Sequence, residues 1–226
     1  MPQGKGLLTP IQRAFLKAFA ELPDQAQFYL AGGTALAEYY LGHRLSFDLD
    51  LFTGEAALIL PLSYQIEALG QPGELAIAVS RRFASYVEFE VTQGSETLKV
   101  DLAQDSPFHL EPPAQTEEGI RVAALADLRV DKLLAYYGRA EPRDAVDLYF
   151  ILRDAPLDLL LTQAASKDPG FDLYWFAVAL GRAEDFPDEL TRWPVQMLLA
   201  FEPSQLKAEF RELARQLMAR VTGRGG

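Results

Sequence analysis

The sequence predicts an α/β (α+β) fold, in which a mixed sheet with flanking helices precedes a helical C-terminal domain. In the first half, short apolar runs that favour strands alternate with helical spacing and end in a cluster of three strand candidates. A segment with three prolines and little periodicity follows at residues 104–119. The longer segments after it have the apolar spacing of helices. We therefore expect a first domain over residues 1–112 and a second over residues 113–226.

The individual elements follow from local patterns. The first helix has the clearest start, because Thr9 can act as its N-cap, Pro10 suits the first helical position and Gln12 completes a capping box. The expected strands cover residues 27–31, 45–52, 75–81, 83–91 and 97–103. The expected helices cover residues 10–22, 34–41, 56–69, 125–137, 142–152, 156–165, 173–180 and 204–221.

Composition places the chain among ordinary globular proteins. Its 226 residues can bury a sizeable core, and 49% are hydrophobic and 23% charged. The absence of cysteine excludes disulfides and thiolate metal sites. No apolar run reaches the roughly 20 residues of a membrane span, and the N-terminus lacks the pattern of a secretory signal. We expect a cytoplasmic protein without a membrane partner.

The charge is negative and uneven along the chain. The formal net charge is −11, of which residues 1–118 contribute −9 and the remainder −2. Such a balance argues against a surface built broadly for nucleic acid. Any polyanion is expected to bind mainly to the C-terminal half.

A Gly-Gly-Thr turn stands between an expected strand and an expected helix in FYLAGGTALAEYYLGHRLSFDLDLF, residues 28–52. Gly32 and Gly33 lack a Cβ, so the backbone can turn sharply and phosphate oxygens can approach its N–H groups. Thr34 adds a hydroxyl donor at the start of the helix, where free N–H groups and the helix dipole favour an anion. These three residues are candidate phosphate ligands.

Two aspartates follow on the next expected strand. Because side chains alternate between the faces of a strand, we expect Asp48 and Asp50 to point the same way, roughly 6–7 Å apart. Two such carboxylates can share divalent cations about 3.5–4 Å apart, an arrangement used for in-line displacement at phosphorus. The apolar run around them supports a metal site, because unpaired charge is costly to bury.

A second acid-x-acid pair, Glu88 and Glu90, favours a different interpretation. The two glutamates alternate with Val87, Phe89 and Val91. We interpret them as the solvated face of an amphipathic strand.

A third carboxylate, Asp101, lies near the end of the strand expected at residues 97–103. In a two-metal site it would bind the metal nearer the acceptor and help to take the proton of the attacking hydroxyl. The alternative is an ordinary aspartate that caps the following turn. The upstream motif favours the catalytic role.

Two segments together resemble a known family. The first, AGGTALAEYYLGHRLSFDLDLF, closely resembles the signature of the AbiEii/AbiGii-type nucleotidyl transferases, the toxin half of many bacterial toxin–antitoxin pairs. The second, DLRVDKLLAYYGRAEPRDAVDLYFIL, is similar to that family at Asp127, Lys132, Arg139, Arg143, Asp144 and Asp147. The resemblance covers roughly residues 28–152.

The resemblance implies a polymerase-β-like nucleotidyltransferase fold and a divalent metal ion, Mg²⁺ or Mn²⁺. It implies that Lys132 contacts the nucleotide. It also implies triphosphate or metal contacts for Gly33, Thr34, Asp48, Asp50 and Asp101. Family members are associated with modifying RNA, notably transfer RNA ends, so RNA is the acceptor and a cognate antitoxin the partner that the resemblance implies.

Basic side chains beside these motifs are further candidates. Arg44 lies between the glycine turn and the aspartates, and Arg is suited to bidentate phosphate contact. The alternative for Arg44 is a structural ion pair. Lys132 and Arg139 share a helical face because they are seven residues apart, and we expect the ammonium of Lys132 at the edge of its helix.

Acidic and basic residues at the start of the next helix complete this group. Arg143, Asp144 and Asp147 can support a basic wall over the active site or form an ion-pair network between two helices. Both can hold at once, with Lys132 on the nucleotide and Asp144 orienting a basic side chain.

These features predict a metal-dependent nucleotidyltransferase that moves a nucleoside monophosphate from a nucleoside triphosphate to an acceptor, with residues 113–226 completing the cleft. Two alternatives stay open. One is a nucleotide-binding regulator without transfer activity, although triphosphate binding alone would not need Asp101. The other is transfer to a protein or a small molecule, which the acidic charge favours.

Overall fold

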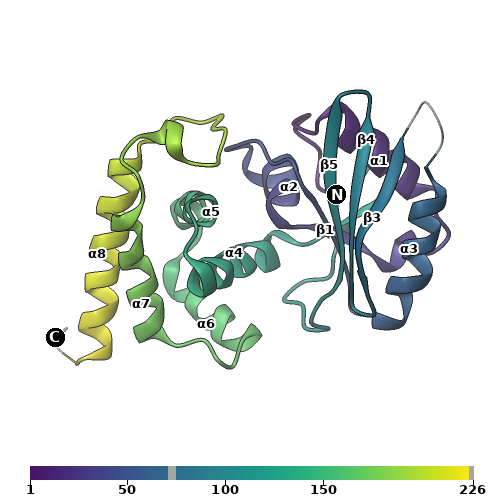
Figure 1. Cartoon of the computed structure of the whole chain (residues 1–226). Helices are drawn as coiled ribbons and strands as arrows, with labels where there is room; N and C mark the ends of the chain where they lie inside the picture. The colour runs from purple at the N-terminus through teal and green to yellow at the C-terminus, as the bar shows by residue number, and fades with distance from the viewer. Residues whose placement is uncertain (71–74, 224–226) are drawn as a thin grey trace. The chain divides into compact units, whose positions relative to one another are not determined.

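A computed structural model describes residues 1–70 and 75–223 (Figure 1). The chain forms two compact units, Met1–Leu125 and Ala126–Gly226. We expected the first domain to end at residue 112. The first unit extends further because two short strands add to its sheet, β6 (Ala114–Gln115) and β7 (Arg121–Val122). They lie within and just after the segment with three prolines at residues 104–119.

The first unit is built on a mixed seven-stranded sheet, which confirms the predicted fold class. The strand order is β3-β4-β5-β2-β1-β7-β6. Besides β6 and β7, its strands are β1 (Tyr29–Ala31), β2 (Leu49–Thr53), β3 (Ala76–Phe83), β4 (Tyr86–Gln93) and β5 (Glu96–Gln104). β2 runs parallel to β5 and antiparallel to β1, which in turn runs parallel to β7.

The helices of this unit are α1 (Pro10–Ala20), η1 (Gln25–Gln27), α2 (Gly32–Leu36), η2 (Ala37–Leu41), η3 (Ala56–Leu58) and α3 (Ile59–Ala68). α1 begins as predicted. The hydroxyl of Thr9 accepts a hydrogen bond from the N–H of Gln12, whose side chain accepts one from the N–H of Thr9.

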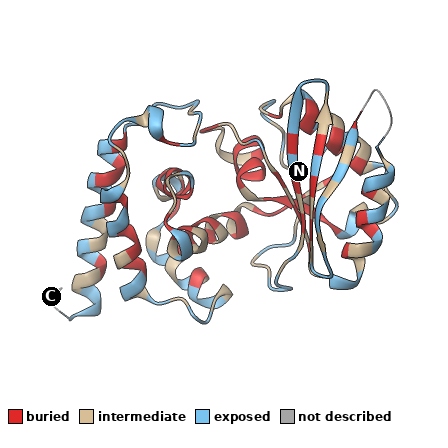
Figure 2. Ribbon diagram, viewed as in Figure 1, coloured by how far each residue is buried: buried red, intermediate tan, exposed pale blue. Residues whose placement is uncertain are grey.

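The core of the first unit lies on one face of the sheet, where α1 contacts β5 and α3 contacts β3, β4 and β5 (Figure 1). This face carries the fully buried residues Val87, Phe89, Val91, Leu98, Val100 and Leu102. Glu88 is half-buried and Glu90 exposed on the opposite face, so the amphipathic strand predicted from their alternation is confirmed (Figure 2).

Two local predictions were wrong in detail. Residues 45–48 were expected to belong to a strand, but β2 begins only at Leu49, because the carbonyl groups of Ser46 and Asp48 accept hydrogen bonds from the side chains of Gln12 and Thr34. The expected helix at residues 34–41 begins earlier, at Gly32, and its second half is a π-helix.

The second unit is helical, as predicted. Its helices are α4 (Leu125–Arg139), α5 (Pro142–Asp154), α6 (Leu157–Lys167), α7 (Leu173–Gly181), η4 (Arg182–Asp185), η5 (Leu190–Arg192) and α8 (Pro203–Val221). α7 packs along α8, and Tyr136 of α4 meets Phe210 of α8 edge to face, with ring centroids 5.3 Å apart.

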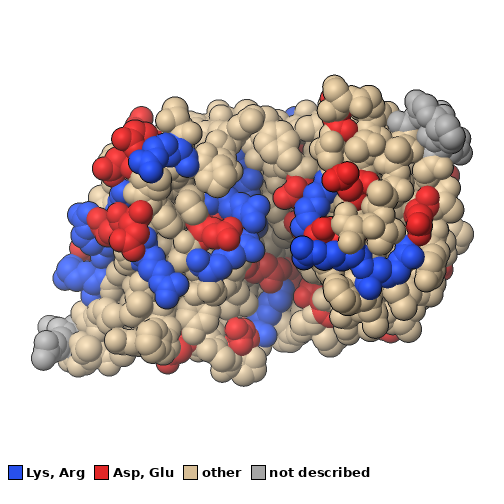
Figure 3. All heavy atoms as spheres, viewed as in Figure 1, with Lys and Arg blue, Asp and Glu red and all other residues tan. Residues whose placement is uncertain are grey.

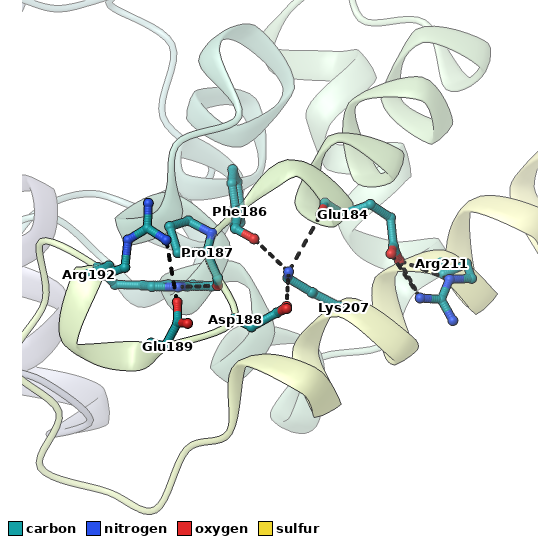
Figure 4. A network of polar contacts seen from close by, with 9 residues as sticks. Glu184, Phe186, Pro187, Asp188, Glu189, Arg192, Lys207 and Arg211 are labelled. Carbon is teal, nitrogen blue, oxygen red and sulfur yellow. Dashed lines mark hydrogen bonds and ion pairs between the residues drawn. The ribbon is translucent and has the colours of Figure 1, made fainter.

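A polar network fixes the connection between α7 and α8 (Figure 4). Lys207, which is 8% exposed, donates to the carbonyl of Phe186 at 2.6 Å and to the carboxylate of Asp188 at 2.7 Å. Arg211 makes a bidentate contact with Glu184 at 2.8 and 2.9 Å. The buried lysine is thus neutralised by groups from the connecting segment.

Candidate active site

The glycine turn at the end of β1 is shaped by close approach of other groups. Gly32 has φ +66°, and a Cβ built on it would lie 1.9 Å from Oδ2 of Asp50. A Cβ on Gly33 would lie 2.6 Å from Nη2 of Arg44 and 2.9 Å from Oγ of Ser46. A Cβ at Gly32 would displace Asp50, and one at Gly33 would require the end of the Arg44 side chain to move, so the turn lies directly against both.

Thr34 and Arg44 hold the chain around this turn. The hydroxyl of Thr34, which is 2% exposed, donates to the carbonyl of Asp48. Arg44 is 5% exposed, and one of its terminal nitrogens donates to the carbonyl of Leu45 at 2.9 Å. A hydroxyl has only one proton to donate, and in this structure Thr34 uses it to hold the backbone of Asp48.

Asp50 lies at the centre of the site. On β2 it is paired with Ala31 of β1 on one side and with Asp101 of β5 on the other. Residues that are direct partners on adjacent strands, about 4.8 Å apart, point to the same face of the sheet. The topology therefore brings together two carboxylates that are 51 positions apart in the sequence. Asp48 immediately precedes the strand.

Both carboxylate oxygens of Asp101 have hydrogen-bond partners. The Tyr86 hydroxyl is 2.8 Å from Oδ1, and Nζ of Lys99 is 2.7 Å from Oδ2. Burial and the hydrogen bond to Asp101 raise the pKa of Tyr86, so this hydroxyl stays protonated and donates. Asp101 is held from two directions by neighbours on β4 and β5.

The donor set fits a hard cation, although it does not form a complete cage. Within residues 1–70 and 75–223, no group of three histidine, aspartate or glutamate side chains is arranged to hold a metal ion. Mg²⁺ is usually bound by only one or two protein carboxylates, with water and substrate phosphates supplying the other oxygens. Asp50 with Asp48 or Asp101 satisfies that requirement.

The candidates from the second sequence segment lie in the second unit. Nζ of Lys132 is 2.8 Å from Oδ2 of Asp147 and 3.9 Å from Oδ1 of Asp144. Arg139 makes a bidentate contact with Asp144, and Arg143 contacts Glu141 at 3.2 Å.

Burial distinguishes these ion pairs from surface pairs. Asp144 and Asp147 are fully buried, and Lys132 is 8% exposed. The ammonium of Lys132, which was expected at the edge of its helix, is buried there by two carboxylates on α5. The ion-pair network predicted between the two helices is present.

A match to a protein family covers nearly the whole chain. The model of the AbiEii nucleotidyl transferase toxin of type IV toxin–antitoxin systems matches residues 14–222. The chain belongs to the AbiEii nucleotidyl transferase toxin family. The predicted family is thereby confirmed.

Individual relatives are more distant. The protein aq_aa25 of Aquifex aeolicus is 29% identical over 157 residues, which are 66% of this chain and 68% of that protein. A proposed nucleotidyltransferase from H. pylori shares the fold with a TM-score of 0.63 at 21% identity, over 96% of this chain and 95% of the other. The toxin MenT4 of Mycobacterium tuberculosis has a TM-score of 0.57 at 17% identity, over 92% and 81%.

Membership of the AbiEii family defines the class of the protein. It is a nucleotidyltransferase of a toxin–antitoxin system, which implies a nucleotide substrate and an antitoxin in general terms. Nucleotidyltransferases of this kind generally use a divalent metal ion. In the parts of the chain that the structure describes, no helix has the length and hydropathy to cross a membrane.

Several contacts in and around the candidate site were not predicted from the sequence. Glu38, 3% exposed, accepts hydrogen bonds from the backbone N–H groups of Gly6, Leu7 and Leu8. Its position within an apolar helix, in ALAEYYL, was the available signal. The contacts of Tyr86 and Lys99 with Asp101 depend on strand register, which local patterns do not reveal.

Proposed function

We propose that the protein transfers a nucleoside monophosphate from a nucleoside triphosphate to the 3′ end of an RNA such as transfer RNA, in the cytoplasm and with Mg²⁺ or Mn²⁺. The acceptor hydroxyl oxygen forms a bond to the α-phosphorus. The bond from that phosphorus to the α–β bridging oxygen breaks, and pyrophosphate leaves. Catalysis of this kind depends on positioning and on neutralisation of charge.

The first unit supplies the reacting groups. Asp48 and Asp50 would hold the metal ions, which supply charge neutralisation and orient the triphosphate. Asp101 would bind the metal ion on the acceptor side and help to take the hydroxyl proton. The backbone of Gly32 and Gly33 would bind the leaving phosphates, because side chains are absent where Asp50 and Arg44 approach.

One observation carries this proposal. Asp50 and Asp101 are direct partners on the parallel strands β2 and β5, and Gly32 lies against Asp50. This arrangement supports the proposal, because it would bring metal-binding carboxylates and a phosphate-binding turn to one point of the sheet. A nucleotide-binding regulator would not require the second carboxylate at that point.

Basic residues supply the remaining contacts. Arg44 would contact the triphosphate from the first unit, since its guanidinium lies over Gly33. Lys132 would contact the nucleotide. Asp144 and Asp147 would orient the basic groups, and Arg139 and Arg143 would support them. Figure 3 shows acidic and basic side chains interspersed on the visible face, so local contacts rather than one broad basic surface would bind the RNA.

An acceptor survey tests the proposal. Each of the four triphosphates, labelled at the α-phosphate, would be incubated with the protein and Mg²⁺ in the presence of total RNA, a protein extract or buffer alone. We expect label in RNA of transfer RNA size, and 3′-end sequencing would locate the added nucleotide.

Two results would contradict the proposal that RNA is the acceptor. Label attached to protein would identify a protein-modifying transferase, and label in a small product would identify a small-molecule acceptor. EDTA serves as the control for dependence on the metal ion.

A further inference from the structure

Three carboxylates form a row across the exposed face of the sheet. Asp50 of β2 is the register partner of Asp101 of β5, and Asp101 is the register partner of Glu88 of β4. All three point to the same face, because direct partners on adjacent strands do so. Like charges in such positions repel one another, so the row requires a cation.

Lys99 supplies a cation at the middle of this row. Its Nζ is 2.7 Å from Oδ2 of Asp101 and 3.4 Å from Oε2 of Glu88. The side chain of Lys99 is 45% exposed, whereas those of Asp101 and Glu88 are 18% exposed. The ammonium thus already lies between two carboxylates, and its flexible stem can favour either of them.

Tyr86 connects the same two carboxylates. Its hydroxyl is 2.8 Å from Oδ1 of Asp101 and 3.0 Å from Oε2 of Glu88. Glu88 lies within reach of both groups that contact Asp101. Glu88 is therefore available as a partner for an ammonium that leaves Asp101.

A divalent cation on Asp101 would compete with Lys99. The ammonium contacts Oδ2 directly, and a second positive charge at the same carboxylate would repel it. A short movement toward Glu88, whose Oε2 already lies 3.4 Å from Nζ, would keep Lys99 paired. Tyr86 can keep its hydrogen bond to Oδ1 of Asp101, because its hydroxyl carries no positive charge that the cation would repel.

We propose that Lys99 is a positioning residue that neutralises Asp101 before a divalent cation binds and then transfers to Glu88. Glu88 thus acts on metal binding only through Lys99. This inference rests on the proposed function, in which Asp101 is a metal ligand. It gives Glu88 a role beyond that of a solvated strand residue.

Mn²⁺ binding, followed by electron paramagnetic resonance, tests this exchange without requiring activity. The proteins are the wild type, Lys99→Met, Glu88→Gln and the double variant. We expect Lys99→Met to tighten Mn²⁺ binding and Glu88→Gln to weaken it, each by roughly three- to tenfold. In the Lys99→Met background, Glu88→Gln should have almost no effect.

A purely electrostatic role for Glu88 predicts a different pattern of Mn²⁺ affinities among these four proteins. If Glu88 attracted the cation only through its charge, Glu88→Gln would weaken Mn²⁺ binding equally in both backgrounds, and that additivity would overturn the exchange. Glu90 provides a matched control, because it is the exposed register partner of Lys99 on β4. We expect Glu90→Gln to change Mn²⁺ affinity by less than about twofold.

Asp101→Asn separates this inference from the proposed function. If Asp101→Asn binds Mn²⁺ as the wild type does, Asp101 is not a metal ligand, and both proposals fail at this residue. If Asp101→Asn loses Mn²⁺ binding but the effects of Lys99→Met and Glu88→Gln are additive, only the proposed exchange of Lys99 is wrong. Thermal melts establish that each variant is folded, and Lys99→Gln replaces Lys99→Met if the latter is not.

Discussion

The carboxylate of Asp50 occupies the space that a side chain on Gly32 would need. A Cβ on Gly32 would lie 1.9 Å from Oδ2 of Asp50, well inside any van der Waals contact. The conformation of the glycine turn and the position of the Asp50 carboxylate are therefore linked. Replacing the glycine should displace the aspartate.

Gly32→Ala should reduce transfer by more than about a hundredfold, because a misplaced catalytic group loses much of its effect. Steady-state kinetics would measure the loss. Gly94→Ala is the matched control, because Gly94 has a similar φ of +62° and no atom within 4 Å of a built Cβ. Both variants carry the strain of an alanine at positive φ, about 1–2 kcal/mol.

Only Gly32→Ala should impair the reaction. Equal activities in the two alanine variants would show that Asp50 tolerates displacement. Asp50 would then not be the central residue of the site of transfer.

Lys132→Ala should lower stability strongly. It leaves the buried carboxylate of Asp147 without its ammonium at 2.8 Å, and removing one partner of a buried ion pair costs about 3–5 kcal/mol. A calorimetric melt should show a fall of roughly 10 °C. Triphosphate affinity per folded molecule should also fall, by about ten- to a hundredfold, if the ammonium contacts nucleotide.

Lys167→Ala distinguishes the two effects. Lys167 pairs with the buried Asp127 at 3.3 Å and with Asp131 at 2.6 Å, so its loss should also destabilise the second unit. Its triphosphate affinity should be unchanged. If both variants bind triphosphate like the wild type, Lys132 is a structural residue and the nucleotide contact is wrong.

Divalent metal and triphosphate together should raise the melting temperature by more than the sum of their separate effects. Ligands that bind only the folded state stabilise it by mass action. A metal ion shared by the phosphates and the aspartates makes the two bindings cooperative. Differential scanning fluorimetry with each of the four nucleotides, with and without millimolar Mg²⁺, measures this. Strictly additive shifts for every nucleotide would argue against a shared site.

Much of the fold could be predicted because its signals are local. The capping box at Thr9 and the alternation around Phe89 each depend on a few neighbouring residues, and both match the structure. The late start of β2, at Leu49, could not be predicted in this way. Gln12, more than 30 positions away, binds the carbonyl of Ser46 and keeps it out of the strand ladder.

The candidate site was predictable in composition but not in its supporting contacts. The spacing of Asp48 and Asp50 indicated metal chemistry, but only strand register shows that Asp101 lies beside Asp50. Lys132 illustrates the opposite difficulty. Its helical position indicated an ammonium at the helix edge but did not reveal that two carboxylates on another helix bury it.

The most direct test of the account measures both products of a single turnover. Wild-type protein, Asp50→Asn and Asp101→Asn would be mixed with α-labelled triphosphate, Mg²⁺ and the acceptor RNA, and both labelled RNA and pyrophosphate would be quantified. We predict that wild type forms the two in equal amounts, and that each variant forms neither although a thermal melt shows that it is folded. The melting temperature of Asp50→Asn should stay at or above that of the wild type, because one of two repelling charges is removed. Turnover at the wild-type rate in folded Asp50→Asn would contradict the central claim that the paired carboxylates of β2 and β5 form the site of nucleotidyl transfer.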